Sequence, residues 1–406
     1  MVLRRRALDT VREAPLPNPP SGWSTCFTAL GDASAFDQVG ARWAALWRAA
    51  GAPYYLSPAW ARTCVGAAPP GSVTLAEITD ADGTCRGLGL LGAVVEKRAG
   101  ALSVRQLRLN EAGAAADATV PVEENVLLCR AADEPPVWAA LLAGLRGGTA
   151  PAWDEFVATN APARLEPLVN DARVHRRAAG TAWIVDLAAL RRDGVDDLDS
   201  YVASLGKNTR AQLRRSIRLY EADGPLVYDV ARTREEARAG FDALAALHEA
   251  KWRALARPGV LSSRHLYEFH TAYIDAAFAE GLVEVAAARA GGRLIGRLYN
   301  FVDENAARYY MGGFPPENDN RLKPGLTTQA LAVAHHLTSG RAIYDFMVGD
   351  ERYKASLGRR GGPIVSVAVQ APRVGLAVEA AARAAKRGMQ RWTRGRQEER
   401  SCATSS

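Results

Sequence analysis

Residues 323–358 read KPGLTTQALAVAHHLTSGRAIYDFMVGDERYKASLG, and the elements predicted in this stretch decide the fold. Pro324 fixes φ for the first turn of an apolar helix, and Gly340 is a stop signal at its end. RAIYDFMV (341–348) then reads as a buried strand, followed by a short charged helix. AARYYMGGF (306–314), ahead of the helix, also reads as a strand. Strand, helix and strand in this order form a βαβ unit, so we expect the two strands to be parallel neighbours.

The residues around this unit extend the pattern. Gly291-Gly292 separates two strand-like runs, LVEVAAARA (282–290) and RLIGRLYNFV (293–302), and predicts a β-hairpin. Apolar residues recur at helical spacing in 241–252 and 263–279. PIVSVAVQ (363–370) is predicted as a last strand. The predicted order is helices, three antiparallel strands, helix, strand, short helix and strand.

The first half of the chain repeats this order faintly. It predicts a helix, a hairpin around Asp82-Gly83, a third strand, a helix and a strand, at 36–51, 72–97, 101–110, 135–147 and 153–160. The offset between the halves is about two hundred residues, a plausible domain length. We therefore expect an α+β (mixed α/β) protein with two similar domains, each a mixed sheet flanked by helices.

The length of the chain supports two domains. At 406 residues it exceeds the size at which a single core usually keeps growing. We predict a mobile N-terminal arm over 1–20, a first domain over 21–195, a second over 196–370 and a basic C-terminal helix or tail over 371–406.

Composition narrows the functional class. The chain is 48% hydrophobic and 23% charged, as in ordinary globular proteins. The longest apolar run, GLGLLGAVV (87–95), is about half of what a spanning helix needs. The N-terminus has arginines without an apolar segment behind them, unlike a secretory signal. We expect no transmembrane segment and a cytoplasmic location.

Cysteine and histidine patterns argue against a metal centre. The five cysteines are scattered, outside metal-ligand spacing. The one close histidine pair is His335-His336, and adjacent residues on a helix do not share a face. We expect no disulfide framework, no metal site and no tightly bound cofactor.

Positive charge is concentrated in two places. The net charge is +7, and 371–406 holds eight Lys or Arg against three Glu. A second basic block is GKNTRAQLRRSIRLYE (206–221). Such blocks are usually solvated faces, but two of them favour a polyanionic partner, either cofactor phosphates or an RNA such as tRNA.

Several of these stretches together resemble a known family. LHEAKW (247–252), YYMGGF (309–314), 323–358 and the basic helix 207–219 look like the CelD/BcsL-type acyltransferase domain of the GNAT superfamily, which is related to the Fem aminoacyl-tRNA-dependent transferases. The resemblance extends to sequence motifs over residues 200–370, whereas over residues 21–190 it is limited to the order of the elements. It implies tandem GNAT-like domains and transfer of an acyl or aminoacyl group to a substrate amine, on a small molecule, lipid or glycan. The implied co-substrate is aminoacyl-tRNA or acyl-CoA.

The helix beginning at Pro324 is the expected donor site. A helix N-terminus presents free N–H groups and partial positive charge to an anion. GNAT enzymes carry a Q/R-x-x-G-x-G/A loop here, whereas this chain has Arg321-Leu-Lys-Pro-Gly-Leu with one glycine. That departure weakens the CoA inference and, with the basic helix, narrowly favours aminoacyl-tRNA. The predicted donor-binding residues are Arg321, Lys323, Gly325, Leu326, Thr327, Lys207, Arg210 and Arg214.

The predicted catalytic residues are Lys354, Tyr353, Asp345 and Tyr310. In Fem-type enzymes a lysine matching Lys354 of the Tyr353-Lys354 pair lies at the transfer centre, and a fixed cation there stabilises the developing negative charge. Sequence spacing alone would place Lys354 on the protein surface. Asp345 is an acid within an apolar strand and needs a partner. It could be structural, orient the amine or pair with Lys354.

The proton acceptor and the acceptor pocket stay open. Tyr310, Asp345 and His248 are candidate bases, and solvent or the substrate itself is an alternative. Tyr309 and Tyr310 should face opposite ways along their strand. His248 and Trp252 share a helical face, either as a packing pair or as a wall of the acceptor pocket. An alternative of another class is a non-catalytic scaffold that binds RNA or a membrane surface.

Overall fold

The computed structural model describes residues 18–98, 102–111, 120, 122–165, 174–349, 351–381 and 385. Most of the predicted N-terminal arm and of the basic tail lies outside these residues. None of the helices in this described part of the chain combines the length and apolar character needed to cross a membrane.

The first half contains a helical pair followed by a mainly antiparallel sheet. Its elements are β1 (Ser24–Leu30), α1 (Ala33–Ala50), α2 (Pro58–Ala67), β2 (Val73–Thr79), β3 (Cys85–Arg98), β4 (Leu102–Leu109), β5 (Leu128–Cys129), α3 (Glu134–Arg146) and β6 (Glu155–Pro162).

The second half repeats that order after a first strand and three helices, and it ends with a further helix and strand. Its elements are β7 (Val174–Asp186), α4 (Leu187–Arg192), α5 (Leu198–Ser204), α6 (Lys207–Glu221), β8 (Leu226–Val230), α7 (Arg234–Ala254), α8 (Arg264–Ala277), β9 (Val283–Ala290), β10 (Arg293–Val302), β11 (Ala306–Gly313), α9 (Pro324–Thr338), β12 (Ile343–Val348), α10 (Arg352–Leu357) and β13 (Arg359–Gln370).

The predicted fold class and repeat are confirmed. β9 and β10 form an antiparallel hairpin, and β11 and β12 are parallel neighbours joined by α9. In the first half β4 and β6 are likewise parallel and joined by α3. The structure is therefore a large mixed sheet flanked by helices, with one βαβ unit in each half.

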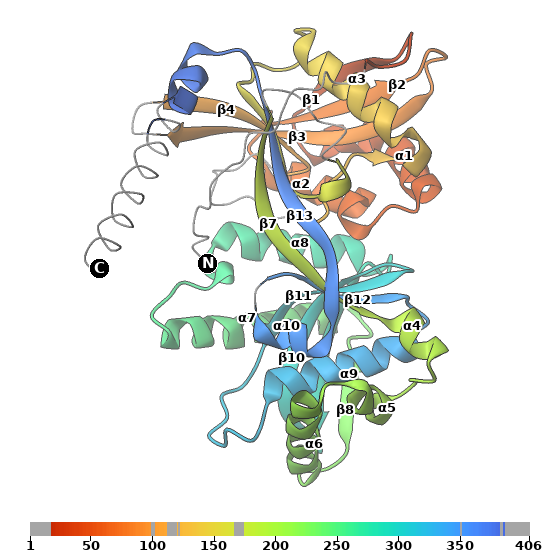
Figure 1. The fold of residues 1–406 in the computed structure, drawn as a ribbon, viewed down its shortest axis with the longest axis vertical. Helices are drawn as coiled ribbons and strands as arrows, with labels where there is room; N and C mark the ends of the chain where they lie inside the picture. The colour runs from red at the N-terminus through yellow and green to blue at the C-terminus, as the bar shows by residue number, and fades with distance from the viewer. Residues whose placement is uncertain are drawn as a thin grey trace, which may run out of the picture.

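Two long central strands connect the halves. The sheet order is β1-β2-β3-β4-β6-β13-β7-β12-β11-β10-β9-β8, with β5 paired to β3. Figure 1 shows β7 and β13 running side by side from one lobe to the other. β13 pairs with β6 over Ile364–Gln370, while β7 pairs with β12. The last strand of the described chain thus completes the sheet of the first half, and the domain boundary near 195 stays a prediction.

Aromatic side chains also join the halves away from the sheet. The Tyr54 ring stacks on Phe301 of β10 with centroids 4.3 Å apart. Trp60 of α2 meets Phe269 and Tyr273 of α8 edge-on, at 5.1 and 4.8 Å. These rings are almost completely buried. The halves therefore share a hydrophobic core, in addition to hydrogen bonds between strands.

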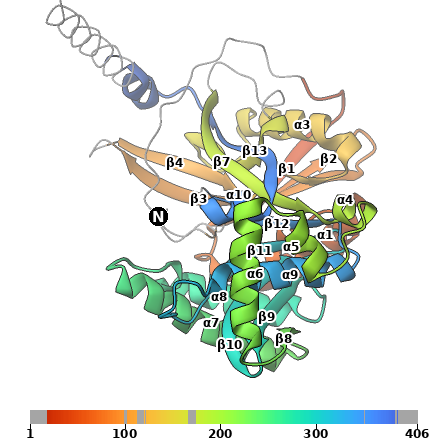
Figure 2. The same ribbon diagram turned by 60° about the horizontal axis from the view of Figure 1, so that its bottom comes forward.

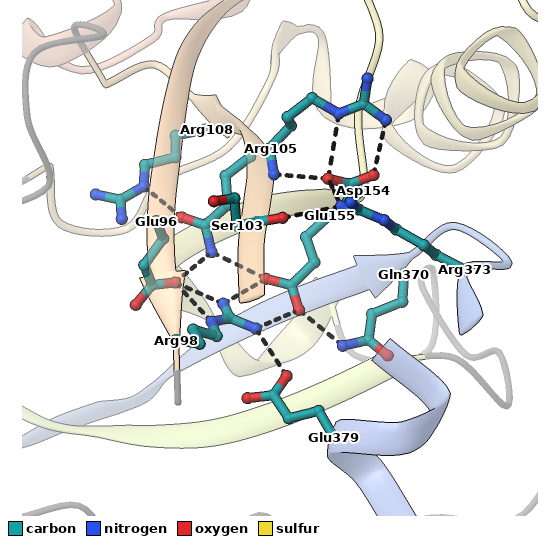
Figure 3. A network of polar contacts seen from close by, with 11 residues as sticks. Glu96, Arg98, Ser103, Arg105, Arg108, Asp154, Glu155, Gln370, Arg373 and Glu379 are labelled. Carbon is teal, nitrogen blue, oxygen red and sulfur yellow. Dashed lines mark hydrogen bonds and ion pairs between the residues drawn. The ribbon is translucent and has the colours of Figure 1, made fainter. Parts of the chain in front are cut away.

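A polar network ties the residues after β13 to the first half (Figure 3). The buried Glu155, at the start of β6, accepts hydrogen bonds from Arg98 at 2.6 Å, Gln106 at 2.9 Å and Gln370 at 2.7 Å. Arg373, just before the helix that begins at residue 374, pairs with Asp154. Each buried carboxylate has several donors, so the network fixes this end of the chain on β4 and β6.

Candidate functional site

The parallel strands β11 and β12 diverge in the middle of the second half. They pair only from Ala306–Ile343 to Arg308–Asp345, although β11 continues to Gly313 and β12 to Val348. Met347 has φ 60°, in the left-handed region that a non-glycine residue rarely adopts. β12 therefore turns away from β11, and its backbone polar groups need partners outside the ladder.

Side chains supply those partners. Asp345 accepts the backbone N–H of Met347 at 2.7 Å. Glu123, from the first half, accepts the N–H of Val348 at 2.8 Å. The indole of Trp183 on β7 donates to the carbonyl of Gly349 at 3.0 Å. The exit of β12 is thus held by its own strand, by the neighbouring strand and by the other half of the molecule.

Lys354 completes this arrangement from α10. It is only 5% exposed, and its Nζ donates to the carbonyls of Val348 at 3.0 Å and Met347 at 3.4 Å. Its third contact is the Glu351 carboxylate at 3.2 Å, whose side chain is half exposed. These contacts match the three donors of an ammonium group. Lys354 is therefore a buried cation that reaches a substrate only by giving up one contact, and Glu351 is the most exposed of them.

Two carboxyl groups beside Lys354 have shifted pKa values. Burial raises the pKa of Glu123 to about 8 and that of Asp345 to about 6, against the opposing influence of the Lys354 charge. At neutral pH Asp345 is mainly ionised and Glu123 mainly protonated. Two acids whose pKa values are pushed to either side of neutrality are an arrangement typical of acid–base catalysis.

The two tyrosines on β11 face opposite sides, as strand alternation predicts. The Tyr310 hydroxyl lies 2.9 Å from Nε2 of His270 on α8, and its ring packs on Phe301. Burial lowers the pKa of His270 to about 3, so this imidazole stays neutral. Tyr309 packs with the other core cluster, which includes Tyr353 and α9 residues. Tyr310 therefore faces the side shared with the first half, and Tyr353 lies with Tyr309 on the α9 side.

The predicted donor-binding residues at α9 are partly committed to α6. The backbone N–H of Lys323 donates to the Ser216 hydroxyl at 2.9 Å, and that hydroxyl lies 2.9 Å from the Thr327 hydroxyl. Pro324 has no N–H, so the N–H groups of Gly325 and Leu326 are the free ones of the first turn. Arg321 forms a surface ion pair with Asp319 at 2.7 Å.

The basic residues of α6 lie beside that helix start, where Figure 2 shows α6 crossing α9. Lys207 and Arg214 are exposed, as are Arg215 and Arg218. The Arg210 guanidinium donates to the carbonyl of Ala203 at 2.8 Å. The structure thus places a positive face next to the N-terminus of α9.

His248 and Trp252 bind each other. The Trp252 indole donates to Nε2 of His248 at 2.9 Å, and both side chains are partly buried. Burial lowers the pKa of His248. In the described part of the chain no hydrogen bond or ion pair links this pair to Asp345 or Lys354. Its place in an acceptor pocket stays a prediction.

Three residues at the site carry no signal in the sequence. Glu123 lies between strands in a stretch without a recognisable motif, and His270 reads as one more helix residue. Arg308 pairs with Asp303 and lies over the Tyr54 ring at 5.6 Å. Only the folding of the first half onto the second brings Glu123 to β12.

The expectation that His335 and His336 would not meet, because adjacent helix residues do not share a face, is wrong. Ring nitrogens of both lie near the Glu284 carboxylate, at 3.8 and 3.3 Å. Adjacent helix positions point in different directions, but here the two long side chains converge on the two oxygens of one acid.

Comparison with known families identifies the second half. Residues 207–355 match the family model described as an acetyltransferase (GNAT) domain. This region contains the divergence of β11 and β12, the start of α9, and Lys354. The match shows a GNAT acyltransferase domain, so the protein is an acyltransferase. No curated protein sequence shows a significant match to the chain.

Solved structures show a distant similarity. L-PGS from Bacillus licheniformis is 10% identical with a TM-score of 0.49, covering 88% of this chain and 98% of that one. FemX is 10% identical with a TM-score of 0.47, covering 74% and 88%. A tandem GNAT protein from the clavulanic acid biosynthesis pathway is 13% identical with a TM-score of 0.43, covering 86% and 100%. At these values the similarities assign no donor or acceptor.

Proposed function

We propose, from the GNAT acyltransferase domain in residues 207–355, that the protein forms an amide at the exit of β12, by passing an acyl or aminoacyl group to a substrate amine. One observation carries the proposal: Asp345, Glu123 and Lys354 meet where β11 and β12 diverge, with pKa values of about 6 and 8 for the two acids. A base, an acid and a cation are the groups that acyl transfer to an amine requires.

Each group has a role in the transfer. The amine nitrogen attacks the carbonyl carbon of the donor, and Asp345, ionised near neutral pH, takes the proton that the nitrogen loses. Lys354 exchanges Glu351 for the carbonyl oxygen as that oxygen becomes negative. The bond to the leaving oxygen or sulfur then breaks, and Glu123, protonated near neutral pH, gives that atom a proton. Tyr310 and Tyr353 line the two sides of β11 next to this centre.

The donor in this proposal is an aminoacyl-tRNA. The exposed basic face of α6 lies beside the N-terminus of α9, and a polyanion contacts such a face over several residues. The resemblance to CelD/BcsL-type and Fem-type enzymes fits either an aminoacyl-tRNA or an acyl-CoA donor, so the charge of α6 and the single glycine before Leu326 carry the choice. The second candidate is acyl-CoA, favoured by the match to an acetyltransferase domain. The acceptor is the amine of a small molecule, lipid or glycan.

The two candidate donors, aminoacyl-tRNA and acyl-CoA, are distinguished by measuring which of them the full-length protein consumes. One arm offers tRNA charged with radiolabelled amino acids, and the other offers acetyl-CoA with detection of the free thiol. Both contain a panel of simple amines, including an amino sugar, and each is repeated with RNase. Amine-dependent loss of label that RNase abolishes supports the tRNA donor. Thiol release that survives RNase identifies acyl-CoA instead. If neither donor is consumed, the proposal is contradicted and the non-catalytic scaffold is supported.

A further inference from the structure

A buried cluster of metal-ligand side chains lies at the opposite end of α9 from the donor site. Glu284 projects from β9 to the last turns of α9, where His335 and His336 meet it. Nε2 of His335 is 3.8 Å from one carboxylate oxygen, and Nε2 of His336 is 3.3 Å from the other. The three ligand atoms all lie within 4.8 Å of one another. We propose that Glu284, His335 and His336 bind one divalent transition metal ion, with zinc the best match.

Unpartnered polar atoms point to a missing ligand. His336 is completely buried, and neither of its ring nitrogens has a hydrogen-bond partner in the part of the chain that the structure describes. Its Nε2 is close to Glu284 but outside hydrogen-bond geometry. A buried polar nitrogen without a partner costs free energy. A cation between the imidazole and the carboxylate would give Nε2 of His336 a partner.

Neighbouring groups hold the carboxylate in place as an outer layer of a metal site does. The Tyr228 hydroxyl donates to Oε1 of Glu284 at 3.0 Å, and the Asn300 amide donates to the same oxygen at 2.9 Å. Such second contacts fix the orientation of ligating carboxylates. The Tyr228 ring also packs on the His335 ring at 5.1 Å. Glu284 is therefore oriented by groups that are not themselves among the three proposed ligands.

The donor set selects the metal. Two imidazoles and one carboxylate, with a fourth position left for water, are a known zinc ligand set. Ligand atoms about 2.0–2.2 Å from a tetrahedral zinc lie roughly 3.3–3.6 Å apart. The distance of 3.3 Å from His336 Nε2 to Oε1 of Glu284 has this spacing, whereas His335 Nε2 lies 3.8 Å from the other oxygen. Rotation of His335, whose side chain is 35% exposed, closes the remaining gap and also gives the ion a way in.

The ion would connect the C-terminal turns of α9 to β9. Its role is to hold the end of α9 against the sheet. This inference stands apart from the proposed acyl transfer, because it rests on other residues and is tested by metal content.

Metal content and thermal stability of the full-length protein test the site. Protein stripped with a chelator is titrated with zinc and dialysed, and the bound metal is measured together with Tm. We expect one zinc per chain and a higher Tm with zinc. His335→Ala should lower zinc affinity at least tenfold. His265→Ala, a partly buried histidine on α8, is the matched control and should bind like the wild type.

Two further measurements keep the test decisive. Glu284→Gln preserves the shape of the side chain, so a folded variant that loses the metal supports the site. Co²⁺ in place of zinc should give the visible absorption of a four-coordinate ion, and this band should be absent from His335→Ala. Zinc-free wild-type protein after titration, or equal binding by His335→Ala, would overturn the proposal and leave a buried histidine–glutamate pair.

Discussion

A carboxyl oxygen of Glu123 accepts the backbone N–H of Val348 at 2.8 Å, although the two residues are 225 positions apart. This hydrogen bond joins the first half of the chain to the turn that carries the catalytic candidates of the second half. The candidate site is therefore composite. The match to a GNAT domain begins at residue 207, and yet one of the titratable groups at its centre comes from outside the matched region.

Replacing Glu123 with glutamine should change how stability depends on pH. Burial raises the pKa of Glu123 from 4.5 to about 8, so the folded protein holds more protons than the unfolded chain between these values. The free energy of unfolding of the wild type should therefore fall as pH rises through this window, by about 1.4 kcal/mol per unit of pKa shift at most. Glu123→Gln keeps an acceptor for Val348 and should flatten the decline. Urea denaturation at several pH values measures it, and an equally steep decline in the variant would contradict the assignment.

Asp345→Asn should abolish most turnover while the protein stays folded. The asparagine oxygen still accepts the N–H of Met347, but the side chain no longer takes a proton from the amine. Loss of a general base typically costs about 10²- to 10⁴-fold in rate. The wild-type rate should rise with a midpoint near pH 6, where Asp345 ionises, and the variant should lack that limb. A fall in kcat with KM unchanged distinguishes catalysis from binding, and an unaltered pH profile would exclude Asp345 as the base.

Lys354→Ala should reduce both stability and activity. It leaves the carbonyls of Met347 and Val348 without their side-chain donor, which costs about 1–3 kcal/mol. Loss of the cation should lower kcat by about 10²- to 10³-fold. Chemical denaturation and kinetics under one condition measure the two effects. A folded Lys354→Ala protein with near-wild-type turnover would remove Lys354 from the transfer step.

Gly349→Ala separates the position of Lys354 from its charge. A Cβ at residue 349 would collide with the Glu351 carboxylate and lie 2.5 Å from Nζ of Lys354, so both flexible groups must move while the charge of Lys354 remains. We expect kcat to fall at least tenfold with Tm changed by a few degrees at most. Gly362→Ala is the control, because a Cβ there meets nothing within 4 Å among the described residues. Equal activity of the two variants would show that the place of the ammonium is unimportant.

Glu155→Ala should loosen the residues after β13. The variant leaves the largely buried Arg98 with weaker pairing, and breaking such a pair costs about 3–5 kcal/mol. Hydrogen exchange should accelerate over 371–381, which Arg373 and Gln370 connect to this network. Arg264→Ala, which removes an exposed helix pair with Glu268, should change stability by less than about 0.5 kcal/mol. Unchanged exchange over 371–381 in Glu155→Ala would show that the network does not anchor this segment.

Local sequence signals predict much of the second half. Gly291-Gly292 adopt positive φ in the turn between β9 and β10, and Pro324 begins α9. The βαβ unit follows from apolar strands on both sides of that helix. These features depend on residues close together in the chain, where turn and helix-start preferences act directly.

The same signals miss what depends on distant contacts. The sequence of β7 lacks the alternating apolar pattern by which a strand is recognised. Its position in the sheet comes from pairing with β12 and β13. Asp345 and Lys354 are recognisable as unusual, but the sequence does not show that Lys354 binds two carbonyls at a left-handed Met347. Glu123 and His270 come to the site only through packing between the halves. Such residues are invisible to patterns that span a few positions.

The crossing of β13 has a consequence for synthesis of the protein. β6 ends at Pro162, but its neighbour on one side is formed by Ile364–Gln370. While the nascent chain is still emerging from the ribosome, β6 therefore has an open edge able to pair with strands of other chains. The first half finishes folding only after the second half has been translated. Cells making this protein would be expected to shield that edge with chaperones, and truncation before residue 359 should yield aggregates rather than a folded first half.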